Sequence, residues 1–151
     1  MPDFPEDPAA LAGFFQNDGQ HFLPGLLGIN VIELDRGHSK LWLQVEQKHL
    51  ASNGYLHAAT VIALADTACG YGCVATFPPE ASGFTTLELK SNHLGTALTG
   101  VLTADANLVH GGRTTQVWDA VVSSSESAKP VALFRCTQLI LYQAKADLAK
   151  S

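Results

Sequence analysis

The chain has 151 residues, a formal net charge of −5 at neutral pH and nine lysines and arginines. This length fits one domain that buries a core without disulfides or metals, and the acidic balance excludes a broad basic surface for nucleic acid. The three cysteines form no paired motif, and the acidic, proline-rich start is the opposite of a signal peptide. We therefore expect a cytoplasmic protein.

The first third of the chain predicts one short helix and two strands. Residues 8–17 have an amphipathic pattern with Leu11, Phe14 and Phe15 on the apolar side. Residues 29–33 and 40–45 are typical of strands joined by a turn at 35–38. For the chain as a whole, we expect an N-terminal extension over 1–21, a domain over 22–143 and a polar tail over 144–151.

A long apolar helix is predicted from residue 56 to about 77. This segment lacks proline and is rich in Ala and Leu, the best helix formers. Asn53 and Gly54 supply start signals, and Pro78-Pro79 prevents continuation. Nearly every face of the helix is apolar, which indicates burial on most sides. Asp66, Thr67 and several glycines interrupt the segment and argue against a membrane span.

Four further strands are predicted after this helix, over residues 84–93, 99–109, 114–123 and 130–142, with turns at 111–112 and 123–127. Strands segregated around one helix indicate an α+β domain, in which an antiparallel sheet curls around that helix. One sheet layer covers only part of the helix and leaves the sheet edges open. We therefore expect a partner subunit to complete the arrangement.

Asp66 is the first candidate for chemistry. A carboxylate amid so much apolar surface is costly unless something uses or pairs it. The alternative is an Asp that pairs with a buried donor for structural reasons. Thr67 beside it could contact water or substrate, or could bond backwards along the helix.

The run Asn-Gly-Tyr-Leu-His at 53–57, two small residues, and Ala-Leu-Ala-Asp-Thr-Ala at 63–68 carry a resemblance. The pattern resembles the signature of hotdog-fold acyl-CoA thioesterases, particularly the phenylacetate-degradation and 4-hydroxybenzoyl-CoA groups. The resemblance implies a curved antiparallel sheet wrapped around one long central helix, no metal and no cofactor. It implies catalytic roles for the four positions His57, Ala58, Asp66 and Thr67, and substrate contacts for Asn53 and Gly54.

The chemistry of thioester hydrolysis fits this spacing. Backbone amides at a helix start are preorganised to polarise a carbonyl, and the small side chains of Ala58 and Ala59 would let a thioester approach the Ala58 amide. Asp66 lies about 13 Å beyond His57 by helical rise, too far to serve the same carbonyl within one chain. In the families resembled, the helix start of one subunit faces the carboxylate of the other. This implies a homodimer or homotetramer, with Asp66 as general base or as nucleophile.

Two further segments resemble parts of these families. Residues 87–93 are similar to a strand of the dihydroxynaphthoyl-CoA branch, in which His93, and more weakly Asn92, would contact substrate or water; a surface His at a strand end is the alternative. The triplet His110-Gly111-Gly112 lies between two strand patterns and resembles the family's turn that carries a basic residue. Gly112 and Arg113 would then hold a phosphate of CoA, or form an ordinary hairpin turn with a solvated Arg.

Several positions depart from the family pattern. Ala51 stands where an Asn or Gln is usual, Ala58-Ala59 replaces Gly-Gly, and Gly70 replaces a Thr or Ser. The missing amide keeps open a non-catalytic acyl-CoA binding module of the same fold.

A third candidate function is a hotdog enoyl-CoA hydratase or dehydratase. The run from His21 to Gly25 resembles the His-Phe-Pro-Gly run of these dehydratases, but two strands separate it from the helix. The aromatic side chains are candidates to line an acyl pocket or to form core; they are Tyr55, Phe77, Phe84 and Trp118.

Overall fold

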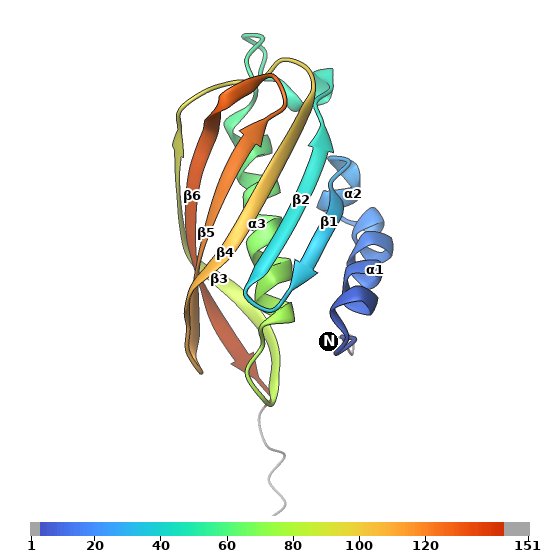
Figure 1. The fold of residues 1–151 in the computed structure, drawn as a ribbon, viewed down its shortest axis with the longest axis vertical. Helices are drawn as coiled ribbons and strands as arrows, with labels where there is room; N and C mark the ends of the chain where they lie inside the picture. Colours follow the sequence, from blue (N-terminus) through green and yellow to red (C-terminus); the bar gives the residue numbers. More distant parts are fainter. Residues whose placement is uncertain (1–3, 144–151) are drawn as a thin grey trace, which may run out of the picture.

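The computed structural model describes residues 4–143 and shows a six-stranded antiparallel sheet curled around one long helix (Figure 1). The elements in chain order are α1 (Pro8–Asp18), η1 (Gly19–His21), α2 (Leu23–Leu26), β1 (Asn30–Asp35), β2 (His38–Gln44), η2 (Gln47–His49), α3 (Ala58–Ala75), β3 (Ala81–His93), β4 (Val101–Gly111), β5 (Thr115–Ser124) and β6 (Ser127–Tyr142). The strand order is β1-β2-β4-β5-β6-β3. The predicted α+β class is confirmed; the predicted tail at 144–151 lies outside the described residues.

The core lies between α3 and the inner face of the sheet. On β2, Leu41 and Leu43 are fully buried, while Trp42 between them and Lys40 before them point outward and are only partly buried. Trp118 on β5 is also fully buried. A Cβ added to Gly72 would lie only 2.7 Å from the nearest carbon of the Trp118 ring. Gly72 therefore makes room for Trp118, which is a core residue and not part of an acyl pocket. By length and composition α3 could cross a membrane, but here it is the core helix of the sheet.

The start of α3 differs from the prediction. Leu56 forms an isolated β-bridge with Leu50, so the helix begins two residues later. The cap is His57, whose extended backbone precedes the first turn. Asn53 does not cap the helix, because its Oδ1 accepts a hydrogen bond from the Tyr55 amide in a local turn. Gly54 has φ +86°, a left-handed conformation that suits glycine. The chain therefore turns at 53–55 before it enters the helix.

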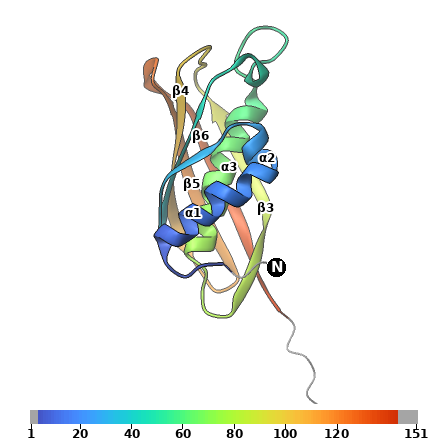
Figure 2. The same cartoon turned by 90° about the vertical axis from the view of Figure 1, so that its right-hand side faces the viewer.

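The N-terminal segment packs alongside β1 and α3 (Figure 2). The Gln16 side chain donates to Asn30 Oδ1 at 3.0 Å and accepts from the Val31 amide at 2.8 Å. Phe15 stacks on Tyr71 of α3 with ring centroids 3.9 Å apart. The short helices at 19–21 and 23–26 were missed by sequence reasoning, and the dehydratase-like run from His21 to Gly25 lies across the junction between them. Its glycine is required there, since a Cβ at Gly25 would lie 2.3 Å from the Gln20 carbonyl oxygen.

Candidate active site

The backbone at the start of α3 is held in place by a buried histidine. His49 is fully buried; its Nδ1 accepts from the Glu46 amide at 2.9 Å, and its Nε2 lies 2.8 Å from the Leu27 carbonyl oxygen. These partners require a neutral imidazole with the proton on Nε2. The His49 carbonyl in turn accepts from the His57 amide at 3.0 Å and from Thr60 Oγ1 at 3.0 Å. His49 thus fixes the entry into the helix.

The amides of the first turn are not equivalent. The Ala59 amide donates to His57 Nδ1 at 3.0 Å, and the Thr60 amide donates to the His57 carbonyl at 3.0 Å. Among the described residues, the Ala58 amide has no acceptor. Ala58 and Ala59 are both exposed. The first amide of α3 is therefore a free donor at the positive end of the helix dipole.

Asp66 lies two turns further along α3, on the side that the sheet leaves partly uncovered. The residue is half-buried, and its Oδ1 is buried without a hydrogen-bond partner among the described residues. Burial raises the pKa of the Asp66 carboxyl above its ordinary value of 3.8. Beside it, Thr67 Oγ1 donates to the Ala63 carbonyl at 2.6 Å, the backward bond expected of a helical Thr. The Thr67 oxygen can still accept a hydrogen bond.

The free amide and the carboxylate do not meet within one chain. Eight residues separate Ala58 from Asp66 on a continuous helix, which corresponds to about 12 Å of rise. A single chain therefore holds the free amide and the carboxylate at different heights on α3.

Asn92 and His93 lie at the same end of the molecule as the start of α3. Just beyond them, the Leu94 amide bonds to the Val131 carbonyl, and Thr96 Oγ1 accepts from the Leu56 amide at 3.2 Å. His93 pairs in register with the buried Ala132, whereas Asn92 pairs with the exposed Leu133. Directly opposed residues share a face of the sheet. His93 is therefore on the inner face with α3, and Asn92 is on the outer face.

Gly112 and Arg113 lie near the other end of α3. The Gly112 amide donates a hydrogen bond to the Thr115 carbonyl at 2.9 Å and so closes the turn between β4 and β5. This agrees with the interpretation of the segment as an ordinary hairpin turn. The guanidinium of Arg113 lies 5.2 Å from the ring centroid of Tyr142. The next strand begins near the C-terminal end of α3, because Gln116 Nε2 donates to the Thr76 carbonyl. One chain therefore does not bring Arg113 together with His57.

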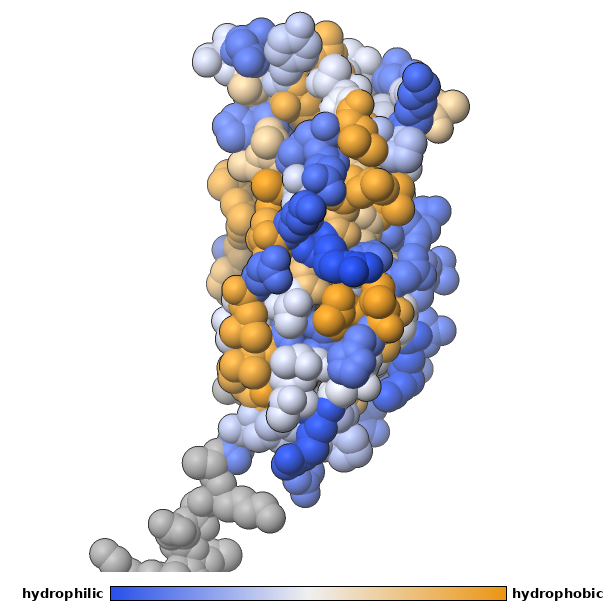
Figure 3. Space-filling view, turned by 90° about the vertical axis from the view of Figure 1, so that its left-hand side faces the viewer, coloured by the Kyte–Doolittle hydropathy of each residue, from blue (hydrophilic) through white to orange (hydrophobic). Residues whose placement is uncertain are grey.

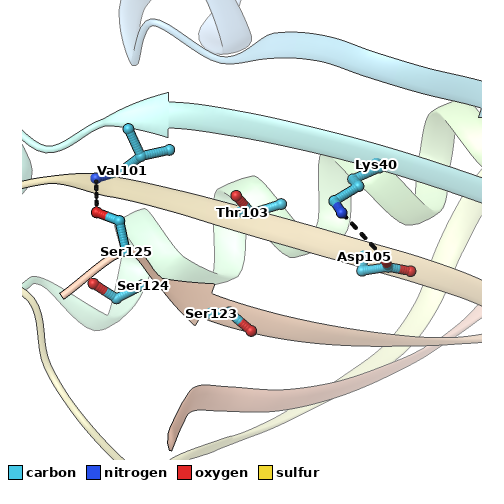
Figure 4. Close-up of a pocket in the computed structure, with 7 residues that line it drawn as sticks. All are labelled: Lys40, Val101, Thr103, Asp105, Ser123, Ser124 and Ser125. Atoms are coloured by element: carbon cyan, nitrogen blue, oxygen red, sulfur yellow. Dashed lines mark hydrogen bonds and ion pairs between the residues drawn. The ribbon is translucent and has the colours of Figure 1, made fainter. Parts of the chain in front are cut away.

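A hollow of about 310 Å³ opens on the outer face of the sheet, away from α3 (Figure 4). It is lined by one ion pair, Lys40 Nζ to Asp105 Oδ2 at 3.9 Å, and by hydroxyl side chains. None of the predicted site residues lines it. Within residues 4–143, no group of three or more His, Cys, Asp or Glu side chains is arranged to hold a metal ion.

Comparison with known proteins identifies the family. A model described as the thioesterase superfamily matches residues 53–131, the stretch from the turn before α3 to β6. The chain belongs to the thioesterase superfamily. It is 32% identical over 111 residues to 1,4-dihydroxy-2-naphthoyl-CoA hydrolase of Listeria monocytogenes, and the matched region covers 74% of this chain and 89% of that relative.

Two more relatives agree with this assignment. The chain is 31% identical over 110 residues to acyl-coenzyme A thioesterase PaaI of Escherichia coli, covering 72% of the chain and 75% of PaaI. The solved structure of a glutamine-to-alanine variant of thioesterase PA1618 from Pseudomonas aeruginosa superposes with a TM-score of 0.77 at 27% identity, covering 93% of this chain and 95% of that one. The fold is thus the hotdog fold expected from the signature at 53–68.

Proposed function

We propose that this protein hydrolyses acyl-CoA thioesters at a site shared by two copies of the chain. The observation that carries the proposal is the free Ala58 amide at the start of α3 together with a half-buried carboxylate, Asp66, about two turns away. Each half fits one need of acyl transfer, since a carbonyl needs a donor as charge develops on its oxygen and water needs a base. A second subunit would bring the two halves together.

A comparison of the two edge strands, β1 and β3, favours a dimer that forms through β3. The β1 edge is short and has α1 beside it. The β3 edge has 13 residues and exposes Leu87 and Leu89. Figure 3 shows this side of the molecule, where apolar surface flanks a polar stripe. A long edge strand with exposed apolar side chains is a template for pairing with another chain.

In the proposed dimer, α3 of each subunit would direct its first amide at the carbonyl oxygen of the thioester. Asp66 of the facing subunit would take a proton from water as the water oxygen adds to the carbonyl carbon. The C–S bond then breaks, and CoA leaves as the thiol with the proton returned to sulfur. Direct attack by the Asp66 carboxylate, followed by hydrolysis of the anhydride, uses the same geometry. His57 serves the site by holding the Ala59 amide, and Thr67 Oγ1 can accept from water.

Several of the remaining predicted residues fit substrate binding near the two ends of α3, whereas the Gly112 amide is already bonded to the Thr115 carbonyl. His93, on the inner face of β3 near the helix start, would contact the substrate, with Asn53 and Gly54 in the adjoining turn; Asn92 points to the outer face. Arg113 keeps an exposed guanidinium and would bind a CoA phosphate beside the Gly112 amide turn. Metal-independent hydrolysis is part of the proposal.

The cysteines support the proposed cytoplasmic location. All three are free and buried. Burial raises the pKa of the Cys73 thiol to about 12, so this thiol is a packing group rather than a nucleophile.

A non-catalytic acyl-CoA binding module is the second candidate. The observation in its favour is Ala51, which has no side-chain amide; its backbone bonds to Tyr55 and Gly54. The Oδ1 atom of Asn53 already accepts a hydrogen bond from the Tyr55 amide, which holds this side chain in the local turn. An enoyl-CoA hydratase is the third candidate and rests only on the run from His21 to Gly25.

Steady-state assays on a panel of saturated, aryl and enoyl-CoA esters separate the three functions. We expect release of free thiol from one or more saturated or aryl esters, detected with a thiol reagent, and no hydration of the enoyl esters. Tight binding of CoA esters without thiol release above background would support the binding module and overturn the hydrolase. Hydration of enoyl esters without thiol release would support the third candidate.

A further inference from the structure

The surface one helical turn beyond Asp66 is shaped by a glycine and an aromatic ring from β3. Gly70 follows Asp66 by four residues, so the two share one face of α3. A Cβ placed on Gly70 would lie 3.0 Å from Cζ of Phe84, closer than ordinary van der Waals contact. The Phe84 ring therefore occupies space that any side chain at position 70 would need.

Phe84 is fixed in this position by its neighbours. It lies on the inner face of β3, opposite the buried Ile140. Its ring meets that of Phe77 edge to face, with centroids 6.4 Å apart. Both rings remain partly exposed, as does Tyr71, which follows Gly70 on α3. The C-terminal side of Asp66 thus presents aromatic surface, whereas the N-terminal side of the helix presents the exposed alanines 58 and 59.

An acyl group whose carbonyl lies at Asp66 can extend in either direction along α3. Apolar groups are stabilised by contact with apolar surface that is removed from water. On the C-terminal side of Asp66, the half-buried Phe84 ring offers such surface, while Tyr71 and Phe77 behind it are packed against Phe15 and Phe4 of the N-terminal segment. The side toward Ala58 leads to the polar turn at residues 51–57, where Asn53, Gly54 and Tyr55 are exposed.

We propose that Phe84, seated against Gly70, forms the end wall of the acyl site and sets its depth. The inference rests on the proposed hydrolase function and deepens it by naming the substrate class. Short acyl chains and single aromatic rings would fit between Asp66 and the Phe84 ring. Long straight acyl chains would meet the ring and be rejected.

The test compares kcat/KM across a series of straight-chain acyl-CoA esters and one benzoyl ester for four proteins. These are the wild type, Phe84→Ala, Phe84→Leu and the control Phe134→Leu, which trims a core ring whose register partners are Ser91 and Ala120. We expect the wild type to prefer short or aryl esters. Trimming Phe84 should shift the preferred chain length upward, raising kcat/KM for long esters relative to short ones by about tenfold. Phe134→Leu should leave the preferred chain length unchanged.

A second comparison tests the contact with Gly70 and does not depend on Phe84→Ala being fully stable. Gly70→Ser should lower kcat/KM in the wild-type background, because the new Cβ would crowd the Phe84 ring. The same substitution should cost much less in the Phe84→Leu background, where the space is free. Thermal unfolding of each variant separates loss of fold from loss of activity.

The outcomes distinguish this inference from the proposed function. No hydrolysis of any ester by the wild type overturns both. Hydrolysis with an unchanged chain-length preference in folded Phe84→Leu, and with equal effects of Gly70→Ser in both backgrounds, overturns the end wall alone. A shifted preference in the Phe84 variants together with non-additive Gly70→Ser effects supports it.

Discussion

The first two residues of α3 differ by one hydrogen bond. The Ala59 amide is bound by His57, and the Ala58 amide is free within the described part of the chain. Position 58 is the first helical residue, where proline is tolerated because that amide has no helical acceptor. His57 already has the extended conformation, φ −70° and ψ 130°, that a residue before proline requires. A single substitution can therefore remove the amide proton and keep the helix.

Ala58→Pro should lower kcat for acyl-CoA hydrolysis by about a hundredfold or more, the usual loss when one oxyanion donor is removed. Ala58→Gly is the matched control, because it keeps the amide and widens the approach to it; its kcat should stay near that of the wild type. Circular dichroism and thermal unfolding establish that both proteins fold. Full activity of a folded Ala58→Pro protein would exclude the Ala58 amide as the oxyanion donor.

The pH dependence of activity reports on Asp66. Burial raises the pKa of its carboxyl above 3.8, and the group must lose its proton to act as base or nucleophile. Activity should therefore fall as the pH drops through that raised pKa, so the acid limb of the kcat/KM profile should lie above pH 3.8. Asp66→Asn should lower kcat by about a hundred- to ten-thousandfold. An unchanged acid limb in Asp66→Asn would assign that limb to another group.

At the scale of the elements, the β3 edge is where a second copy is expected. Leu87 on β3 is 57% exposed, and Ile32 on β1, the opposite edge of the sheet, is 53% exposed. Leu87→Lys should break the dimer, since a lysine on an edge strand opposes strand pairing. Ile32→Lys is the matched control and should leave it intact. Analytical ultracentrifugation measures both; a dimer that survives Leu87→Lys and dissociates with Ile32→Lys would place the interface on β1.

The order of the main elements could be predicted from the sequence because it depends on local patterns. The alternation at Leu41 and Leu43 identified β2, and the proline-free apolar run identified α3. Helical spacing alone showed that His57 and Asp66 of one chain lie too far apart to act on the same carbonyl. The start of α3 was placed wrongly because Asn53 can bond either to a helix amide or to its own turn, and the turn prevails. The sequence pattern did not indicate the structural role of His49, because this residue ends a polar segment and is buried only in the folded chain.

Contacts between distant segments explain the rest of what the sequence could not give. Gly70 was noted only as the absence of a Thr or Ser, and its role depends on where β3 places Phe84. Likewise, the inward position of His93 and the outward position of Asn92 follow from the register of β3 with β6. Such register depends on pairing across the whole sheet and on the bulges at 81–83 and 86–88 of β3.

At the scale of the whole molecule, the central claim is that each site takes its amide from one subunit and its carboxylate from the other. Ala58→Pro removes the first, and Asp66→Asn removes the second. In a dimer of one variant with the other, one site has lost both groups, whereas the other site has both intact.

The most direct test is to unfold the two inactive variants together, refold them as a mixture and measure acyl-CoA hydrolysis. Random pairing makes half of the dimers mixed, each with one complete site, so the mixture should recover about a quarter of wild-type activity. Each variant refolded alone should stay inactive, and wild type refolded alone should regain its activity. A mixture that contains mixed dimers, as native mass spectrometry would show, but no activity above that of the separate variants would contradict a site shared between subunits.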